Sequence, residues 1–115
     1  MMDLKERFLK YVSFDTQSDE RSETFPSTDK QKVLLSYLKE ELETIGLKEV
    51  TMDEYGYVMA TLPATKGYEN APVIGFISHV DTAPDMSGAN VKPHIVENYD
   101  GRDIMLGGNV WLRVE

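Results

Sequence analysis

The run from Val73 to Ile77 most constrains the fold, because it contains no polar position. Successive side chains of a strand point to opposite faces of a sheet, so a strand that is apolar throughout needs cover on both faces. Functional side chains in α/β sheets gather beyond the carboxyl ends of such central strands. The sequence therefore predicts an α/β fold, a mixed sheet flanked by helices, with a candidate site at His79, just after this strand.

Two amphipathic helices are predicted before this strand. The first spans residues 3–12, where Asp3 and Glu6 have the spacing of a capping box. The second spans residues 28–45 and takes Thr28 as its N-cap. Its predicted buried stripe consists of Leu34, Leu38, Leu42 and Ile45.

Two β-hairpins are also predicted. Gly46 ends the second helix, and residues 50–52 then pair with residues 57–62 across a turn rich in Asp and Gly. Residues 103–106 pair with residues 110–114 around a Gly-Gly-Asn turn. Residues 94–96 are expected to form a short strand between them.

Length and charge narrow the class of protein. A chain of 115 residues fits one domain. Its 20 acidic and 12 basic residues give a net charge of −8, which disfavours nucleic acid and anionic lipid as partners. The chain has no cysteine, no signal-peptide pattern and no apolar run long enough for a membrane span, so we expect a cytoplasmic protein.

The triplet His79-Val80-Asp81 carries the candidate chemistry. Residues two apart on an extended chain point the same way, so the Asp81 carboxylate can reach the His79 imidazole. A zinc-binding histidine nearly always donates its other ring N–H to an oxygen, and Asp81 has the type and spacing for this. Taken alone, however, such a triplet is more typical of a structural hydrogen bond at a strand end.

The surroundings of the triplet resemble peptidase T, the tripeptide aminopeptidase family of the zinc exopeptidase superfamily. The similar stretches are Asp15-Thr16-Gln17-Ser18, Pro26-Ser27-Thr28, Gly75 to Asp85, Ser87 to Pro93 and Asn98 to Gly101. Together they extend over about residues 4–106. The resemblance implies that His79 is a zinc ligand and that Asp81 is the catalytic-site aspartate that orients it.

The same resemblance implies the N-terminal part of a zinc-exopeptidase-type α/β domain, here residues 1–115. In that family two zinc ions activate water against a peptide bond, and a small peptide is the substrate. The bridging aspartate, the general-base glutamate, the other ligands and a lid domain lie further along, so we expect them to be absent here. Residues 107–115 do not resemble the family's continuation; an engineered fragment, an interrupted gene and a frameshifted tail are all open explanations.

Two other interpretations stay open. The chain is either part of this aminopeptidase or a non-catalytic α/β fold that acts only through self-association. A related zinc carboxypeptidase or deacylase is the alternative within the enzyme class, because the His-x-Asp motif is shared across the superfamily. An apolar strand without partners leads us to expect a homo-oligomer. His94 is expected to be a surface or half-buried histidine rather than a ligand.

Overall fold

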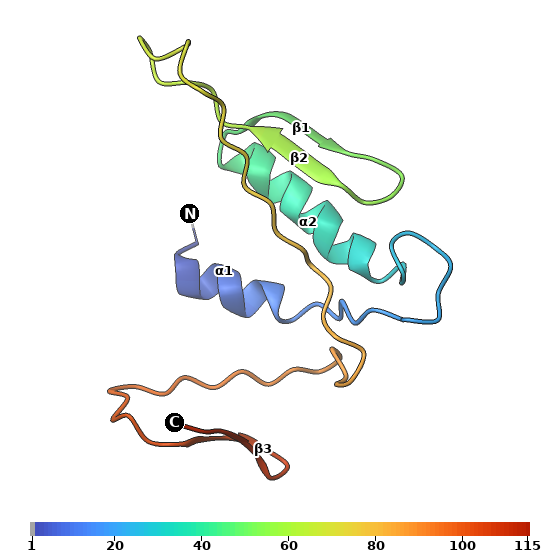
Figure 1. Cartoon of the computed structure of the whole chain (residues 1–115), viewed down its shortest axis with the longest axis vertical. Coiled ribbons are helices and arrows are strands. Elements are labelled where there is room, and N and C mark those ends of the chain that lie inside the picture. The colour runs from blue at the N-terminus through green and yellow to red at the C-terminus, as the bar shows by residue number, and fades with distance from the viewer. Residues whose placement is uncertain (1) are drawn as a thin grey trace.

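The computed structural model describes residues 2–115, which form two helices and two separate antiparallel hairpins (Figure 1). The helices come first, and α2 lies against the first hairpin. An extended segment then leads to the second hairpin at the other end of the molecule. The elements in chain order are α1 (Leu4–Tyr11), α2 (Gln31–Thr44), β1 (Lys48–Met52), β2 (Val58–Thr61), β3 (Ile104–Gly107) and β4 (Val110–Leu112).

Helix α1 begins with the predicted capping box. The Asp3 side chain accepts from the Glu6 N–H at 2.8 Å, and the Glu6 carboxylate accepts from the Asp3 N–H at 2.9 Å. The helix packs on α2 through its last turn, where the rings of Tyr11 and Tyr37 meet edge to face with centroids 6.2 Å apart. Its first turns remain largely uncovered, because Leu4 and Phe8 are exposed.

Helix α2 ends as predicted but begins differently. Gly46 has φ +95°, and the N–H groups of Gly46 and Leu47 bond back to the carbonyls of Glu43 and Leu42, which is a Schellman motif. The predicted cap at Thr28 is wrong: the helix begins at Gln31 without a side-chain cap. The Thr28 hydroxyl instead donates to the Gln17 carbonyl at 2.9 Å and accepts from Gln31 Nε2 at 3.1 Å, so its oxygen accepts from a side chain and not from a backbone N–H of the helix.

The hydrophobic core lies between α2 and the hairpin of β1 and β2. Leu35 is buried there against the turn at Gly56, whereas Leu34 is buried on the side of α2 that faces α1, and the rest of the predicted stripe on α2 is half-buried. The hairpin pairs Met52 with Val58 and Thr51 with Met59, as the turn chemistry predicted. This small layer of one helix on one hairpin is the packed part of the chain.

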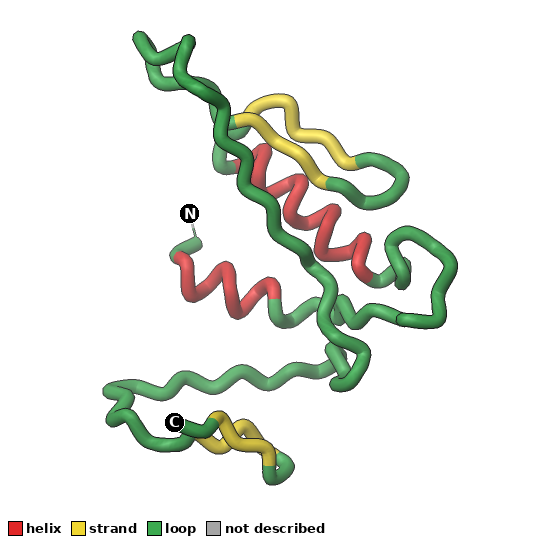
Figure 2. The backbone as a smooth tube through the Cα atoms, in the orientation of Figure 1, coloured by secondary structure: helices red, strands yellow, loops and turns green. Residues whose placement is uncertain are grey.

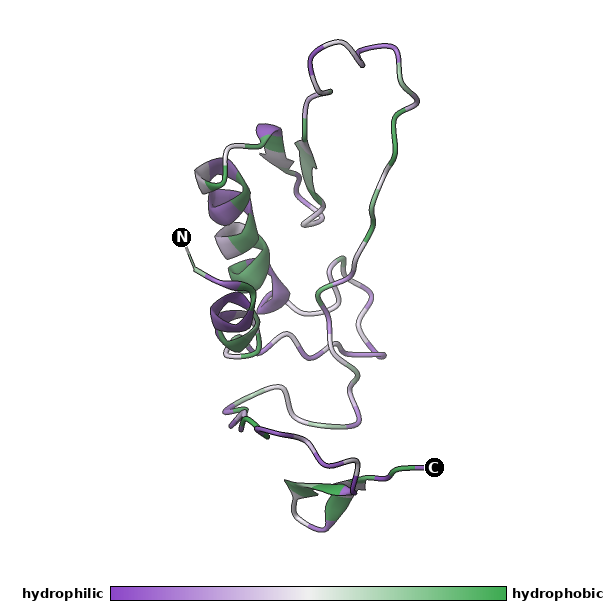
Figure 3. Cartoon of the chain, turned by 90° about the vertical axis from the view of Figure 1, so that its left-hand side faces the viewer, coloured by the Kyte–Doolittle hydropathy of each residue, from purple (hydrophilic) through white to green (hydrophobic). Residues whose placement is uncertain are grey.

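The prediction for residues 73–77 is wrong within this chain. The segment is extended but pairs with no strand in residues 2–115, and Phe76 and Ile77 are 96% and 101% exposed. Figure 2 shows it within the long loop between β2 and β3, and Figure 3 shows apolar stretches along it. The physical reason is that each hairpin pairs only with itself, so no mixed sheet forms to receive the strand.

The second hairpin forms where the sequence predicted it. Strand β3 pairs with β4, and the Asp103 carboxylate closes the open end by accepting from Val114 N–H at 2.9 Å and Arg113 Nη1 at 2.6 Å. The backbone hydrogen bond from Val114, and to a smaller extent the bond from Arg113, holds the pKa of Asp103 below its usual value. The strand expected at 94–96 does not form. Within residues 2–115 neither helix has the length and apolarity to span a membrane.

Candidate functional site

The candidate site contains one short side-chain pair at the end of the extended segment. His79 Nδ1 lies 3.0 Å from Asp81 Oδ1, which is the contact that the two-residue spacing predicted. The His79 side chain is 83% exposed and Asp81 is 43% exposed. The pair is therefore formed at the surface of this chain and is open to further groups.

The contact with Asp81 decides which His79 nitrogen is free. A carboxylate can only accept a hydrogen bond, so Nδ1 carries the proton and donates it to Asp81. In the neutral ring Nε2 then keeps its lone pair, which is the form in which histidine binds a metal ion. The geometry thus leaves Nε2 as the free ring nitrogen of His79.

An open cavity of about 590 Å³ lies beside His79. Apolar side chains from α1, from the loop after it and from α2 form most of its wall, and Ser78, His79 and Val80 close one side. The apolar members include Tyr11, Val12, Phe14, Leu34, Leu38 and Val91. The extended segment thus passes over the helices without filling the space between them.

One contact with the N-terminal loop anchors the chain just after Asp81. Thr82 N–H donates to the Thr16 carbonyl at 3.1 Å, and Ser18 N–H donates to the Thr82 carbonyl at 2.9 Å. This is an isolated parallel bridge between Gln17 and Thr82. The Ser18 hydroxyl adds a bond to the Thr82 carbonyl at 2.9 Å. We call this contact of residues 15–18 with residues 82–88 the Gln17–Thr82 junction.

The loop side of the junction is itself fixed to the start of α2. Asp15 Oδ2 pairs with Lys30 Nζ at 2.9 Å, and Asp15 Oδ1 accepts from the Gln17 N–H at 3.1 Å. The hydrogen bond from Lys30, and after it that from Gln17, holds the pKa of the Asp15 carboxyl below its usual value. Thr16 is buried at the centre of the contact. The ionised Asp15 therefore ties the loop to the helical layer.

On the other side of the junction, formed by residues 82–88, there is little room for a side chain at Gly88. A Cβ atom there would lie 2.7 Å from Asp15 Oδ1 and 3.3 Å from both the Gln17 backbone nitrogen and Thr82 Oγ1. Glycine thus allows the close approach of the two loops, because an added Cβ atom would displace the Asp15 carboxylate.

The sequence does not predict the junction. Residues 15–18 resemble a family loop, but no sequence pattern assigns a role to Thr82 or Gly88. No local pattern could have joined segments that lie more than 60 residues apart. By contrast, His94 is exposed as expected. No set of three or more His, Cys, Asp or Glu side chains is placed to hold a metal ion in the described part of the chain.

Comparison with known proteins identifies the class to which this arrangement is related. No protein-family model matches the chain. Curated proteins that match it carry the name of a peptidase. Peptidase T of Clostridium acetobutylicum is 62% identical over 106 residues, which are 92% of this chain and 26% of that protein. Peptidase T of Geobacillus sp. strain WCH70 is 61% identical over 88% of the chain and 24% of that protein.

The chain is therefore a relative of peptidase T over nearly its whole length, and it spans about a quarter of the length of these relatives. Peptidase T of Clostridium botulinum is 55% identical over 99% of the chain, so that match includes nearly all of residues 107–115. The matches to the other two relatives extend over 92% and 88% of the chain.

Proposed function

We propose that this chain is part of a cytoplasmic dinuclear zinc aminopeptidase that releases the N-terminal residue from tripeptides. The observation that carries the proposal is the His79–Asp81 pair, formed at 3.0 Å within a chain that is 62% identical to a peptidase T. The identity supports the peptidase class. The oriented imidazole supports the metal.

In this proposal His79 binds a zinc ion through Nε2, and Asp81 holds the ring in the ligating tautomer. When bound, zinc supplies Lewis-acid chemistry, because it polarises a carbonyl and lowers the pKa of water toward neutrality. Asp81 touches the ligand rather than the peptide, so its contribution is to keep the imidazole basic and aimed. In this proposal other residues of the complete enzyme bind the second zinc ion, and another of them acts as the general base.

The residues present fit one part of such a site. Zinc sites in proteins use three or four protein ligands, whereas residues 2–115 bring no three ligand-type side chains together. We therefore expect the isolated chain to bind zinc weakly and to leave tripeptides intact. Calorimetric titration that gives a stoichiometric, submicromolar zinc site within one isolated chain would contradict this part of the proposal.

A chimera tests the proposal directly. The chain would replace the matched quarter of Clostridium acetobutylicum peptidase T, and tripeptide turnover would be measured with zinc. We expect turnover by the chimera. His79→Ala should reduce it by more than about 100-fold, and Asp81→Ala by about 10- to 100-fold, the range typical of partners that orient a metal ligand.

The matched control is His94→Ala, which removes the other histidine. His94 is exposed and does not line the cavity beside His79, so this variant should keep the turnover of the chimera. A folded chimera that lacks turnover, or an active one that tolerates His79→Ala, would contradict the proposal. Preferential cleavage of acyl or C-terminal substrates would instead favour the related carboxypeptidase or deacylase.

Self-association is the second candidate role, and one observation favours it. Val73 and Ile77 are 98% and 101% exposed, in an apolar segment that pairs with no strand of residues 2–115. Removal of such side chains from water is favourable, and an unpaired edge is a template for a second copy. We propose that the isolated chain forms a homo-oligomer through this segment, whether or not the complete protein is an enzyme.

A further inference from the structure

We infer that the Gln17–Thr82 junction is the positioning device for His79, with Asp15, Ser18 and Gly88 as its determining residues. The inference rests on the proposed function, because it describes what aims the proposed zinc ligand. It concerns residues that have no role in the pair itself.

The first step is the connection from the junction to the imidazole. Both backbone polar groups of Thr82 are bonded to the N-terminal loop, at 3.1 Å and 2.9 Å. Asp81 directly precedes Thr82, so its backbone direction is fixed at one end. The Asp81 carboxylate then holds His79 Nδ1 at 3.0 Å. The orientation of the ring therefore depends on where the junction places residue 82.

The second step is that little else holds this segment. The residues before the pair, from 71 to 78, are all exposed, and within residues 2–115 no strand pairs with the apolar segment among them. After the pair, Gln17 Nε2 donates to the Pro84 carbonyl at 2.8 Å, which strengthens the same contact. The junction is thus the contact between the helical layer and the candidate site.

The third step is the fit at Gly88. Here φ lies outside the left-handed region, so an alanine meets no intrinsic backbone strain, and only contact decides its effect. The new methyl group would press on the Asp15 carboxylate and on the backbone of Gln17. Gly75, by contrast, has nothing within 4 Å and has no left-handed φ. Gly75→Ala is therefore the matched control in the isolated chain.

The test uses the chain labelled with ¹⁵N at its two histidines, His79 and His94, and compares ring nitrogen signals at one fixed pH. Asp81→Asn supplies the reference spectrum of an unpaired His79. Gly88→Ala should move the His79 signals toward that reference, while the His94 signals stay in place as an internal control. Gly75→Ala should leave both sets unchanged. Circular dichroism confirms that the helices persist.

Two further variants separate positioning from general damage. Asp15→Ala removes the carboxylate that bonds Lys30 and the Gln17 N–H, so it should move the His79 signals in the same direction as Gly88→Ala. Ser18→Ala is a milder variant that deletes only the hydroxyl bond to the Thr82 carbonyl, and it should give a smaller shift of the same sign. His79 signals that stay unchanged in Gly88→Ala and Ser18→Ala would overturn the inference.

The chimera supplies the second readout. Gly88→Ala should lower kcat by about 10- to 100-fold with little change in KM, because a misaimed ligand affects the reaction more than peptide binding. A rise in KM of the same size, with kcat unchanged, would contradict a positioning role. If the unmodified chimera has no turnover, the proposed function fails, whereas the ring nitrogen spectra still decide whether the junction holds His79.

Discussion

Residues 2–62 and residues 63–115 differ in what covers their apolar side chains. The first region packs α2 on the β1–β2 hairpin and buries Leu34 and Leu35. The second region pairs strands only locally, in β3 and β4, and exposes most of its large apolar side chains. Each element of the first region finds its partner within about 30 residues, whereas the extended segment from Val73 to Ile77 pairs with no strand in residues 2–115.

The comparison teaches that a local sequence signal is enough when the partner is also local. A capping box, a helix-terminating glycine and a turn bring their own hydrogen bonds. A strand that is apolar on both faces needs two covering layers and two paired edges. Residues 2–115 do not supply them to residues 73–77. The candidate site lies at the boundary between the two regions, where the Gln17–Thr82 junction joins them.

The largest expected effect is on the free energy of unfolding, which a change at a buried leucine should lower far more than a change at an exposed isoleucine. Leu34 is 6% exposed, so Leu34→Ala should lower the free energy of unfolding by about 2–5 kcal/mol. Ile77→Ala in the isolated chain should change it by less than about 0.5 kcal/mol. Urea titration followed by the helical circular dichroism signal measures both, and equal losses would remove the distinction between the regions.

The next effect concerns self-association through the second region. Phe76→Lys places a charge on the uncovered strand and forfeits about 1.5–3 kcal/mol of burial per side chain, so the oligomer should dissociate. Light scattering coupled to gel filtration measures the mass. Tyr68→Lys, at another exposed aromatic residue outside the strand, should leave the mass unchanged. An unmodified chain that is a cooperatively unfolding monomer would show that the strand needs no partner.

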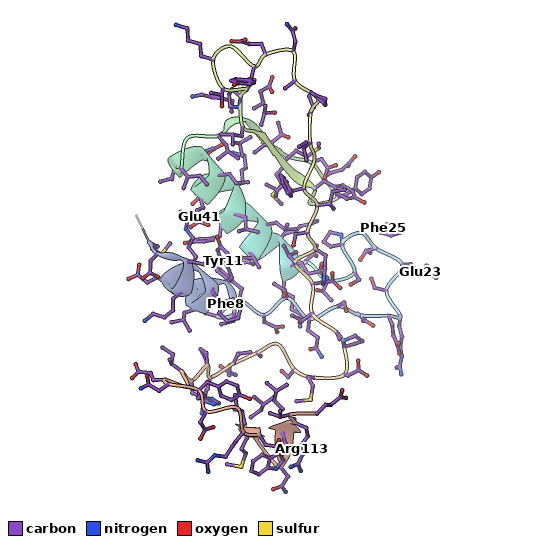
Figure 4. All side chains as sticks on the ribbon, turned by 60° about the vertical axis from the view of Figure 1, so that its left-hand side comes forward. Phe8, Tyr11, Glu23, Phe25, Glu41 and Arg113 are labelled. Atoms are coloured by element: carbon purple, nitrogen blue, oxygen red, sulfur yellow. The ribbon has the colours of Figure 1, made fainter. Side chains whose placement is uncertain are left out.

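The smallest expected effect on the free energy of unfolding comes from the hydrogen bond between α1 and α2 in the first region. Tyr11 donates its hydroxyl to Glu41 Oε2, and the two face each other in Figure 4. Tyr11→Phe should cost about 1 kcal/mol at neutral pH. Burial, and after it the bond to Glu41, raises the pKa of Tyr11 to about 12 from 10.0.

Because the pKa of Tyr11 is raised, the contribution of its hydroxyl to the free energy of unfolding depends on pH. The neutral hydroxyl is favoured by the folded state, so its contribution is complete below pH 10.0 and is lost as the pH rises toward about 12. Unfolding free energies of the unmodified chain and Tyr11→Phe should therefore converge across this range. A gap that stays constant would mean that the hydroxyl does not titrate with folding.

The parts of the fold that the sequence predicted are those with local causes. The capping box of Asp3 and Glu6, the end of α2 at Gly46 and both hairpins form as expected. The predicted cap at Thr28 is wrong because its hydroxyl donates to the Gln17 carbonyl and its oxygen accepts from the Gln31 side chain, contacts that no helical pattern contains. The mixed sheet failed because the pattern of a strand shows its need for partners but not their presence.

The candidate site divides in the same way. The contact of His79 with Asp81 follows from a two-residue spacing and could be predicted. The anchoring of Thr82 by residues 16–18 could not, because the hydrogen bonds are made by backbone groups that every residue carries. The close approach at Gly88 shows only when Asp15 is seen beside it.

Hydrogen exchange measured peptide by peptide tests the contrast between the regions most directly. In dilute isolated chain, amides of α2 and β1 should be protected, whereas amides from Val73 to Ile77 should exchange like unfolded peptide. In the chimera with the remainder of a peptidase T, the same strand should become as protected as α2. Protection of residues 73–77 in the dilute monomer, or continued fast exchange in an active chimera, would contradict the expectation that this segment pairs with residues other than those of the described chain.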